Sequence, residues 1–171
     1  IVPSTILVIP DSHNRNGPGS QRWTWLGRLV AERQPGIIIN LGDLWDMPSI
    51  CDHDRGKGSF YSRRYAEDIA AGHKALDIFD EVVYKEAPSR YKPQRYMLGG
   101  NHDEGRILRP LEQDPRLEGT IGLSDLTHEG WTYVPFLRPL NRCGVLFNHY
   151  FVSGVMGRPV GGRHPARYLL D

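Results

Sequence analysis

The sequence predicts a single domain, residues 1–171, of the mixed α/β (α+β) class. Three short segments have the pattern of buried strands: 4–10 and 37–41, which are rich in β-branched residues, and 94–99, which contains the apolar run Tyr96-Met97-Leu98. Because the first two are separated by enough chain for one helix, we expect them to be parallel neighbours. Each run ends directly in polar side chains, at the edge of the sheet where open α/β folds hold their active sites.

Size, charge and cysteine content restrict the class of protein. The chain has 171 residues, of which 39% are hydrophobic, and this suits one domain with its own core. No apolar run approaches the roughly 20 residues that a membrane-spanning helix needs. The net charge of +1 gives no reason to predict a nucleic-acid-binding protein. The two cysteines lie far apart and form no CxxC pair, which favours a reduced, cytoplasmic protein.

A loop and a helix are expected between the first two strands. Residues 11–19 are polar and glycine-rich, as in loops. Ser20 is a candidate N-cap for a helix with apolar residues at near-helical spacing, and Pro35 terminates that helix. The tryptophans are expected in the core or at its edge: Trp23, Trp25, Trp45 and Trp131.

Residues 47–93 are expected to form a helical insertion. Its first part, 47–61, is irregular, and a long helix from about Ser62 to Glu86 follows, because apolar residues recur there at steps of three, four and seven. Gly72 and His73 interrupt the middle of this pattern.

The last third of the chain predicts a short helix and two more strands. Residues 104–118 suggest a helix that two prolines break. Residues 131–137 and 143–148 alternate in polarity and are predicted to be two strands of an antiparallel hairpin or meander. The second of these leads to His149, and the glycine-rich segment 152–163 is predicted to be a loop.

Eight side chains at the predicted strand ends are of kinds that bind metal ions: Asp11, His13, Asp43, Asp46, Asn101, His102, Asp103 and His149. Carboxylates, imidazoles and an amide together suit a divalent transition metal such as Mn²⁺, Fe²⁺ or Zn²⁺. Carboxylates crowded without cations would repel one another. Two ions about 3.5–4 Å apart would remove that conflict, hold a water as hydroxide and clamp a phosphoryl oxygen. Gly42 and Gly100 would allow the sharp turns that bring metal and substrate close.

Each motif alone is weak, since Asp-x-His is most often a chance surface pair and Gly-Asp-x-x-Asp is as easily a turn. Their ordered conjunction is specific: Asp11-x-His13, Gly42-Asp43-x-x-Asp46, Gly100-Asn101-His102-Asp103 and His149. With these blocks the chain resembles the calcineurin-like metallophosphoesterases over nearly its whole length. The resemblance implies a four-layered αββα sandwich with two metal ions at the carboxyl edge of the sheets.

The resemblance also implies which residues bind the metal ions. Asp11 and His13 would bind one ion, and Asn101 and His149 would bind the second. Asp43 would bridge the two ions.

For the residues around those ligands the implied roles differ. His102 would contact the phosphoryl group and protonate or stabilise the leaving oxygen, without touching metal. Asp46 and Asp103 would orient the ligands. Asn14 and Arg15 follow the first block and are candidates for lining the substrate pocket.

The chain departs from the family pattern in two places. The family's last block, Gly-His-x-His, gives one histidine to each metal and is absent here, with Gly162-Arg163-His164 the nearest echo. We expect the chain to be part of a longer product, with the missing block beyond Asp171. Met47-Pro48 replaces the Arg-Gly of the serine/threonine protein phosphatases, which argues against that branch.

Other residues near the blocks allow more than one interpretation. Arg106 and Arg109 closely follow the third block, where either would reach substrate or pair with Glu104 or Glu112 on the helix surface. Cys51-x-His53 is interpreted as loop and not as half a zinc site, because no second ligand pair follows at suitable spacing.

The expected function is a dinuclear metal-dependent hydrolase of phosphodi- or monoesters. Nucleic acid or nucleotide substrates are expected only by analogy with small members of the family. The alternative is a catalytically weakened scaffold that keeps the fold and binds protein partners, a possibility raised by the missing histidine pair. Metal identity and oligomeric state stay open.

Overall fold

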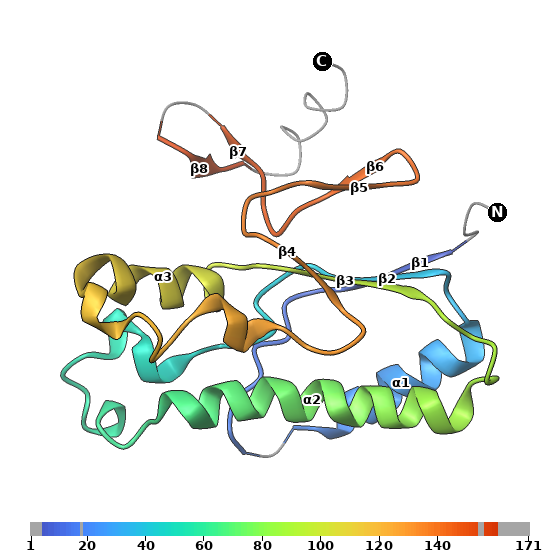
Figure 1. Ribbon diagram of the computed structural model, residues 1–171, viewed down its shortest axis with the longest axis horizontal. Coiled ribbons are helices and arrows are strands. Elements are labelled where there is room, and N and C mark those ends of the chain that lie inside the picture. Colours follow the sequence, from blue (N-terminus) through green and yellow to red (C-terminus); the bar gives the residue numbers. More distant parts are fainter. Residues whose placement is uncertain (1–4, 18, 154–155, 161–171) are drawn as a thin grey trace.

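A four-stranded parallel sheet forms the centre of the fold (Figure 1). The computed structural model describes residues 5–17, 19–153 and 156–160. The strands follow one another across the sheet in chain order: β1 (Ile6–Ile9), β2 (Ile37–Asn40), β3 (Gln94–Leu98) and β4 (Thr132–Val134). The register aligns Ile9 with Asn40 and Asn40 with Met97, so the first three strands end at the same level. The predicted α/β class is confirmed, with its strand ends at one edge.

Two helices cover one face of this sheet, α1 (Gln21–Arg33) and α2 (Tyr65–Glu86). Side chains alternate across a strand, so Ile38 and Met97 point to this face. They join Phe79 and other buried residues of the helices in the larger apolar cluster. Both helices lie close to their predicted positions. In the described part of the chain, no helix has the length and apolarity needed to cross a membrane.

Two hairpins lie on the other side of the sheet (Figure 1). Strands β5 (Leu140–Arg142) and β6 (Val145–Phe147) form the first, and Leu140 packs with Ile39 in the smaller apolar cluster. Strands β7 (Val152–Ser153) and β8 (Arg158–Pro159) form the second, where the sequence predicted only a loop. The described residues thus contain a helix layer, a parallel sheet and a hairpin layer.

The predicted hairpin between 131–137 and 143–148 is wrong. Strand β4 extends the parallel sheet beside β3, and β6 pairs with β5 instead. A two-residue turn closes the real hairpin, with Cys143 and Gly144 both in the left-handed region at φ 54° and 79°. Polarity alternation predicts that a strand exists but not its partner, and a cysteine at the first turn position does not indicate a tight turn.

The helix α3 (Glu104–Gln113) continues through Pro110, which was predicted to break it. Helical hydrogen bonding resumes at once, because the N–H of Asp114 donates to the Pro110 carbonyl at 2.9 Å. Near the end of a ten-residue helix, Pro110 removes one backbone donor without ending the helix.

Trp25 is exposed, contrary to the prediction for the tryptophans. It is 59% exposed, whereas Trp23, Trp45 and Trp131 are buried. Two residues along an α-helix rotate the side-chain direction by about 200°. Because Trp23 faces the core, Trp25 points to solvent.

Gly72 lies in the middle of α2 because the Trp45 indole packs against it. The indole Nε1 donates to the Ile69 carbonyl on the same helix at 3.1 Å, and a Cβ at position 72 would overlap the ring. Gly72→Ala should therefore destabilise the fold by about 1–3 kcal/mol, although alanine is the better helix former. Thermal denaturation would measure the loss.

The matched control is Gly58→Ala, where no atom lies within 4 Å of the added Cβ and φ is negative. Its stability should stay within about 0.5 kcal/mol of wild type. An equally stable Gly72→Ala protein would show that Trp45 does not occupy this position. The contact matters for the site, because Trp45 lies between Asp43 and Asp46 in the turn after β2.

Candidate metal centre

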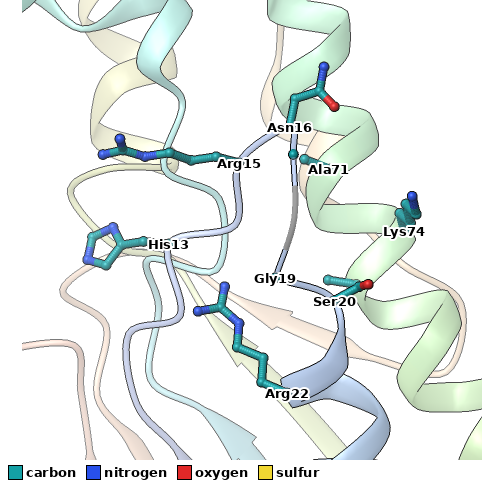
Figure 2. Close-up of a pocket in the computed structure, with 10 residues that line it drawn as sticks. His13, Arg15, Asn16, Gly19, Ser20, Arg22, Ala71 and Lys74 are labelled. Atoms are coloured by element: carbon teal, nitrogen blue, oxygen red, sulfur yellow. The ribbon is translucent and has the colours of Figure 1, made fainter.

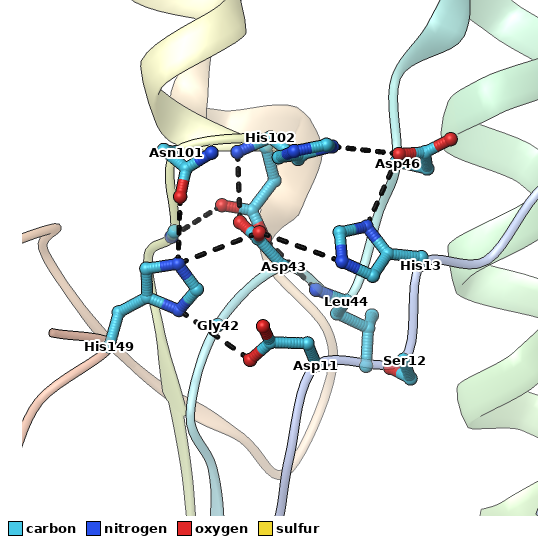
Figure 3. A network of polar contacts seen from close by, with 12 residues as sticks. Asp11, Ser12, His13, Gly42, Asp43, Leu44, Asp46, Asn101, His102 and His149 are labelled. Atoms are coloured by element: carbon cyan, nitrogen blue, oxygen red, sulfur yellow. Dashed lines mark hydrogen bonds and ion pairs between the residues drawn. The ribbon is translucent and has the colours of Figure 1, made fainter.

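The predicted site residues meet at the carboxyl edge of the sheet (Figure 3). Strand β1 leads into the first block, β2 into the second, β3 into the third, and β6 into the last histidine. One polar network joins them, with Asp43 near its middle. The network includes Asp11, His13, Asp43, Asp46, Asn101, His102 and His149.

The backbone is strained where the strands end. Three residues other than glycine have positive φ there: His13 at 45°, Asp43 at 50° and Met47 at 48°. Left-handed backbone is unfavourable for such residues and concentrates at functional sites. Each turns the chain sharply near a strand end, which brings the polar side chains toward the sheet edge.

Gly42 and Gly100 permit close approach, as predicted. A Cβ at Gly100 would overlap the Asp43 carboxylate and backbone nitrogen. A Cβ at Gly42, where φ is +102°, would lie 2.9 Å from Nδ1 of His149. With both side chains absent, the N–H of His102 donates to Asp43 Oδ1 at 2.8 Å.

Asp103 connects the second block to the third. Its buried carboxylate accepts hydrogen bonds from the backbone N–H groups of Leu44 at 3.1 Å and Glu104 at 2.7 Å. Burial raises the pKa of Asp103 to about 6, although these N–H groups oppose the rise. Through these backbone hydrogen bonds Asp103 holds the two turns together.

Two imidazoles flank Asp43, which is only 2% exposed. Its Oδ2 lies 3.8 Å from Nε2 of His13 and 3.5 Å from Nε2 of His149. The other ring nitrogen of each histidine is occupied, since His13 Nδ1 lies 3.2 Å from Asp46 Oδ1 and His149 Nδ1 lies 2.9 Å from the Leu41 carbonyl. A neutral imidazole has one N–H, and these acceptors require it at Nδ1. Both Nε2 lone pairs then face the same carboxylate oxygen.

The two Nε2 atoms and the Asp43 carboxylate oxygen that they face form an arrangement suited to binding cations. Nε2 of His149 also lies 2.9 Å from Oδ1 of Asn101, so three acceptors converge on that side. They would repel one another unless a cation or proton lay between them. Ligand atoms about 2.1 Å from one ion lie roughly 3.0–3.5 Å apart, close to the separations here. The donor set is therefore suited to divalent transition metals.

The donors group differently from what the resemblance implies. Asp11, Asp43 and His149 form one group whose ligand atoms lie within 4.8 Å of one another. His13 forms the other group with Asp46 and His102. Asp11 thus lies nearer the second predicted ion than its assignment suggests.

Asp46 organises the two histidines at the outer side of the network. Its buried Oδ1 accepts from Nδ1 of His102 at 2.8 Å and Nδ1 of His13 at 3.2 Å. Burial opposes ionisation, but the His102 hydrogen bond and the charges of Arg15 and Arg106 outweigh it and lower the pKa of Asp46. Asp46 therefore remains a carboxylate that orients both rings.

The two substrate-binding candidates in the first loop differ. The Asn14 amide is buried, donates to the Leu44 carbonyl at 2.8 Å and accepts from Nε1 of Trp23 at 2.8 Å. It braces the loop, and this geometry argues against direct contact with substrate. The Arg15 side chain pairs with Asp46 on one side. Because it is 66% exposed, an incoming anion can still reach its guanidinium.

The arginines of α3 do not pair with the acidic residues of their own helix among the described contacts. The Arg106 guanidinium donates to the carbonyls of Asp46 and Met47, and so holds the second block. Arg109 pairs with Asp52 at 3.1 Å and stays exposed.

Glu104 is a positioning residue that the sequence did not reveal. Its buried Oε2 accepts from the Tyr133 hydroxyl at 2.6 Å and the Phe136 N–H at 2.7 Å. The Phe136 ring in turn lies 5.9 Å from the His149 ring. Burial, together with the Glu104 carboxylate, raises the pKa of Tyr133, so the hydroxyl remains a donor. These contacts depend on β4 lying parallel to β3, which the sequence did not predict.

Two pockets flank the network. The first, of about 320 Å³, lies between the 11–19 loop and α2, with Lys74 on the helix across from His13 and Arg15 (Figure 2). The second, of about 340 Å³, adjoins Asn101 and His102. Cys51, Asp52 and His53 also line it, the last two from a short 3₁₀ segment (Asp52–Asp54) in a stretch that the sequence had interpreted only as loop. The proposed echo at His164 lies outside the described residues.

Comparison with known proteins agrees with this arrangement. A family model described as calcineurin-like phosphoesterase matches residues 4–169 and so includes every block of the network. No curated protein and no solved structure gives a significant match. Because the family model spans nearly the whole chain and its four blocks converge at one sheet edge, this protein belongs to the calcineurin-like phosphoesterase family.

Proposed function

We propose that this protein hydrolyses phosphate mono- or diesters with two divalent metal ions. Family membership indicates metal-dependent phosphoester hydrolysis. The observation that supports two ions is the position of Asp43, whose Oδ2 lies 3.8 Å from one imidazole Nε2 and 3.5 Å from another. A buried carboxylate between two lone pairs is suited to bridging a pair of cations.

In this proposal His13 would hold one ion, Asn101 and His149 would hold the other, and Asp43 would contact both. Asp11, whose carboxylate groups with Asp43 and His149 in the structure, would turn toward His13 to complete the ligands of the first ion. When bound, the ions supply an ionised water as nucleophile and neutralise charge on the phosphoryl oxygens. The Nδ1 contacts of the two histidines fix their rings, so that Nε2 of each faces the centre.

His102 is proposed as the general acid. Its Nδ1 is held by Asp46 at 2.8 Å, which leaves Nε2 for the substrate. In this role the ring, oriented by Asp46, gives its Nε2 proton to the leaving oxygen. Arg15 is proposed to bind a non-bridging oxygen. A scaffold without catalysis needs none of these contacts, so the network does not favour that alternative.

Metal removal and replacement test the proposal on the full-length protein. Chelated protein should not hydrolyse p-nitrophenyl phosphate or bis-p-nitrophenyl phosphate, and Mn²⁺, Fe²⁺ or Zn²⁺ should restore activity at two ions per chain. Binding should also stabilise the fold, by about 2.7 kcal/mol at a free metal concentration 100 times Kd. Asp77→Asn, an exposed carboxylate on α2, is the control and should behave as wild type. Full activity in chelator, or at one ion per chain, would contradict the proposal.

A further inference from the structure

The pocket between the 11–19 loop and α2 adjoins the metal centre through His13, which lines it and also faces Asp43 (Figure 2). Its volume of about 320 Å³ is at the lower end of the range for small ligands. Three lining residues are cationic, Arg15, Arg22 and Lys74, and none of the described residues that line it is acidic. The pocket therefore offers positive charge to an anion that lies next to the proposed metal ions.

Two of these cations have no ion-pair partner among the described residues. The Arg22 guanidinium extends from the start of α1 toward His13, and it donates to the neutral side-chain oxygen of Asn14 at 2.8 Å (Figure 2). Lys74 is exposed on α2, and in the described part of the chain its ammonium contacts no carboxylate. Arginine and lysine side chains that line a pocket without a carboxylate are suited to binding an anionic ligand.

The start of α1 adds to the positive potential. Ser20 precedes the first residue of this helix and lines the pocket, but its side chain makes no capping hydrogen bond. No acidic residue lies in the first turn, so the partial positive charge at this helix end is not offset there. Arg15 is different, because its charge is paired with Asp46. An anion in the pocket would therefore be held mainly by Arg22 and Lys74.

We propose that this pocket binds a second anionic group of the substrate, so that the substrates are phosphate esters that also carry a carboxylate or a further phosphate. The proposal rests on the proposed function, because that function places the scissile phosphorus at the metal centre, which shares His13 with the pocket. Carboxylate and phosphate oxygens both accept charge-assisted hydrogen bonds from guanidinium and ammonium groups. An ester with a neutral substituent would leave Arg22 and Lys74 without a partner.

Calorimetry with matched two-carbon esters tests this directly. Phosphoglycolate, ethylene glycol bisphosphate and ethyl phosphate share one phosphate ester and end in a carboxylate, a phosphate and a methyl group. They would be titrated into metal-loaded full-length His102→Gln protein, in which turnover is suppressed. At least one anionic ligand should bind roughly tenfold or more tightly than ethyl phosphate, and the tighter of the two identifies the anion. Phosphoethanolamine, which ends in a cation, should not bind more tightly than ethyl phosphate.

Substitutions locate the effect in the same background. Lys74→Gln should lower the affinity ratio of the anionic ligand to ethyl phosphate about two- to fivefold. Arg22→Gln should lower it roughly tenfold, and Lys74→Gln decides the question if that variant does not fold, because Lys74 is exposed. Lys85→Gln on α2 and Arg28→Gln on α1 are the matched controls, since both cations already pair with glutamates. They should leave the ratio unchanged.

Two outcomes would overturn the proposal. The first is a ratio near one in this series and in the matched propyl and butyl series, and the second is a ratio that survives both Arg22→Gln and Lys74→Gln. Hydrolysis of bis-p-nitrophenyl phosphate by the wild-type protein is measured separately. If that activity is absent, the proposed function fails, whereas a ratio that Lys74→Gln lowers still assigns anion binding to this pocket. If activity is present and the ratio is near one, only the second anionic group is ruled out.

Discussion

Asp43→Asn should abolish stable metal binding and lower kcat/KM by at least about a thousandfold. The substitution removes the charge on the oxygen that faces His13 and His149, at 3.8 and 3.5 Å from their Nε2 atoms. A metal centre supplies several kcal/mol of transition-state stabilisation, and each 1.36 kcal/mol corresponds to a factor of ten in rate. Metal content by mass spectrometry and kcat/KM on bis-p-nitrophenyl phosphate measure both effects.

The fold should survive this change. The side-chain oxygen of asparagine can still accept the hydrogen bond that the His102 N–H makes to Oδ1 at 2.8 Å. Asp68→Asn is the matched control, since Asp68 is also a buried carboxylate but accepts from the Ser49 N–H at 2.8 Å, outside the network. It should retain metal and activity. An Asp43→Asn protein with two ions and full activity would remove Asp43 from the centre.

His102→Gln should lower kcat by about 10² to 10⁴ and keep both metal ions. General acid catalysis contributes on this scale, and the His102 side chain contacts Asp46 at 2.8 Å and is not one of the proposed ligands. The loss should be larger for an alkyl ester than for a p-nitrophenyl ester, because a poor leaving group depends more on protonation. Steady-state kinetics on the two esters, with metal analysis, tests this.

His13→Gln provides the contrast. Nε2 of His13 faces Asp43 at 3.8 Å, so its loss should reduce metal content as well as kcat. If His102→Gln lost metal to the same degree, His102 would be a ligand and the general-acid assignment would be wrong. A loss equal for both esters would also contradict proton donation.

The blocks that end the first three strands could be found from the sequence because each is a local feature. In each case an apolar run is followed at once by donors, as in β2 with Asp43 and Asp46. Parallel strands of similar length end at one edge, so side chains far apart in sequence can be predicted to meet. Trp25 shows the limit of local patterns, since hydrophobicity predicted burial and the phase of α1 turned the ring to solvent.

Contacts between segments with no mutual sequence pattern could not be predicted. The role of Glu104 depends on β4 lying beside β3, and polarity alternation had assigned that strand to a hairpin. The aromatic pair of Phe136 and Tyr150 depends on where β4 and β6 end, on two different sheets. Asn14 was a candidate for lining the pocket, but in the structure its amide oxygen accepts a hydrogen bond from Nε1 of Trp23.

The fold class, the family and the convergence of the metal-binding blocks follow from the sequence alone, because strand periodicity and strand-end chemistry are properties of short segments. The partner of β4, the buried role of Glu104 and the shape of the pocket beside His102 required the tertiary structure. They depend on which distant backbones lie side by side, and that is decided by the packing of the whole chain.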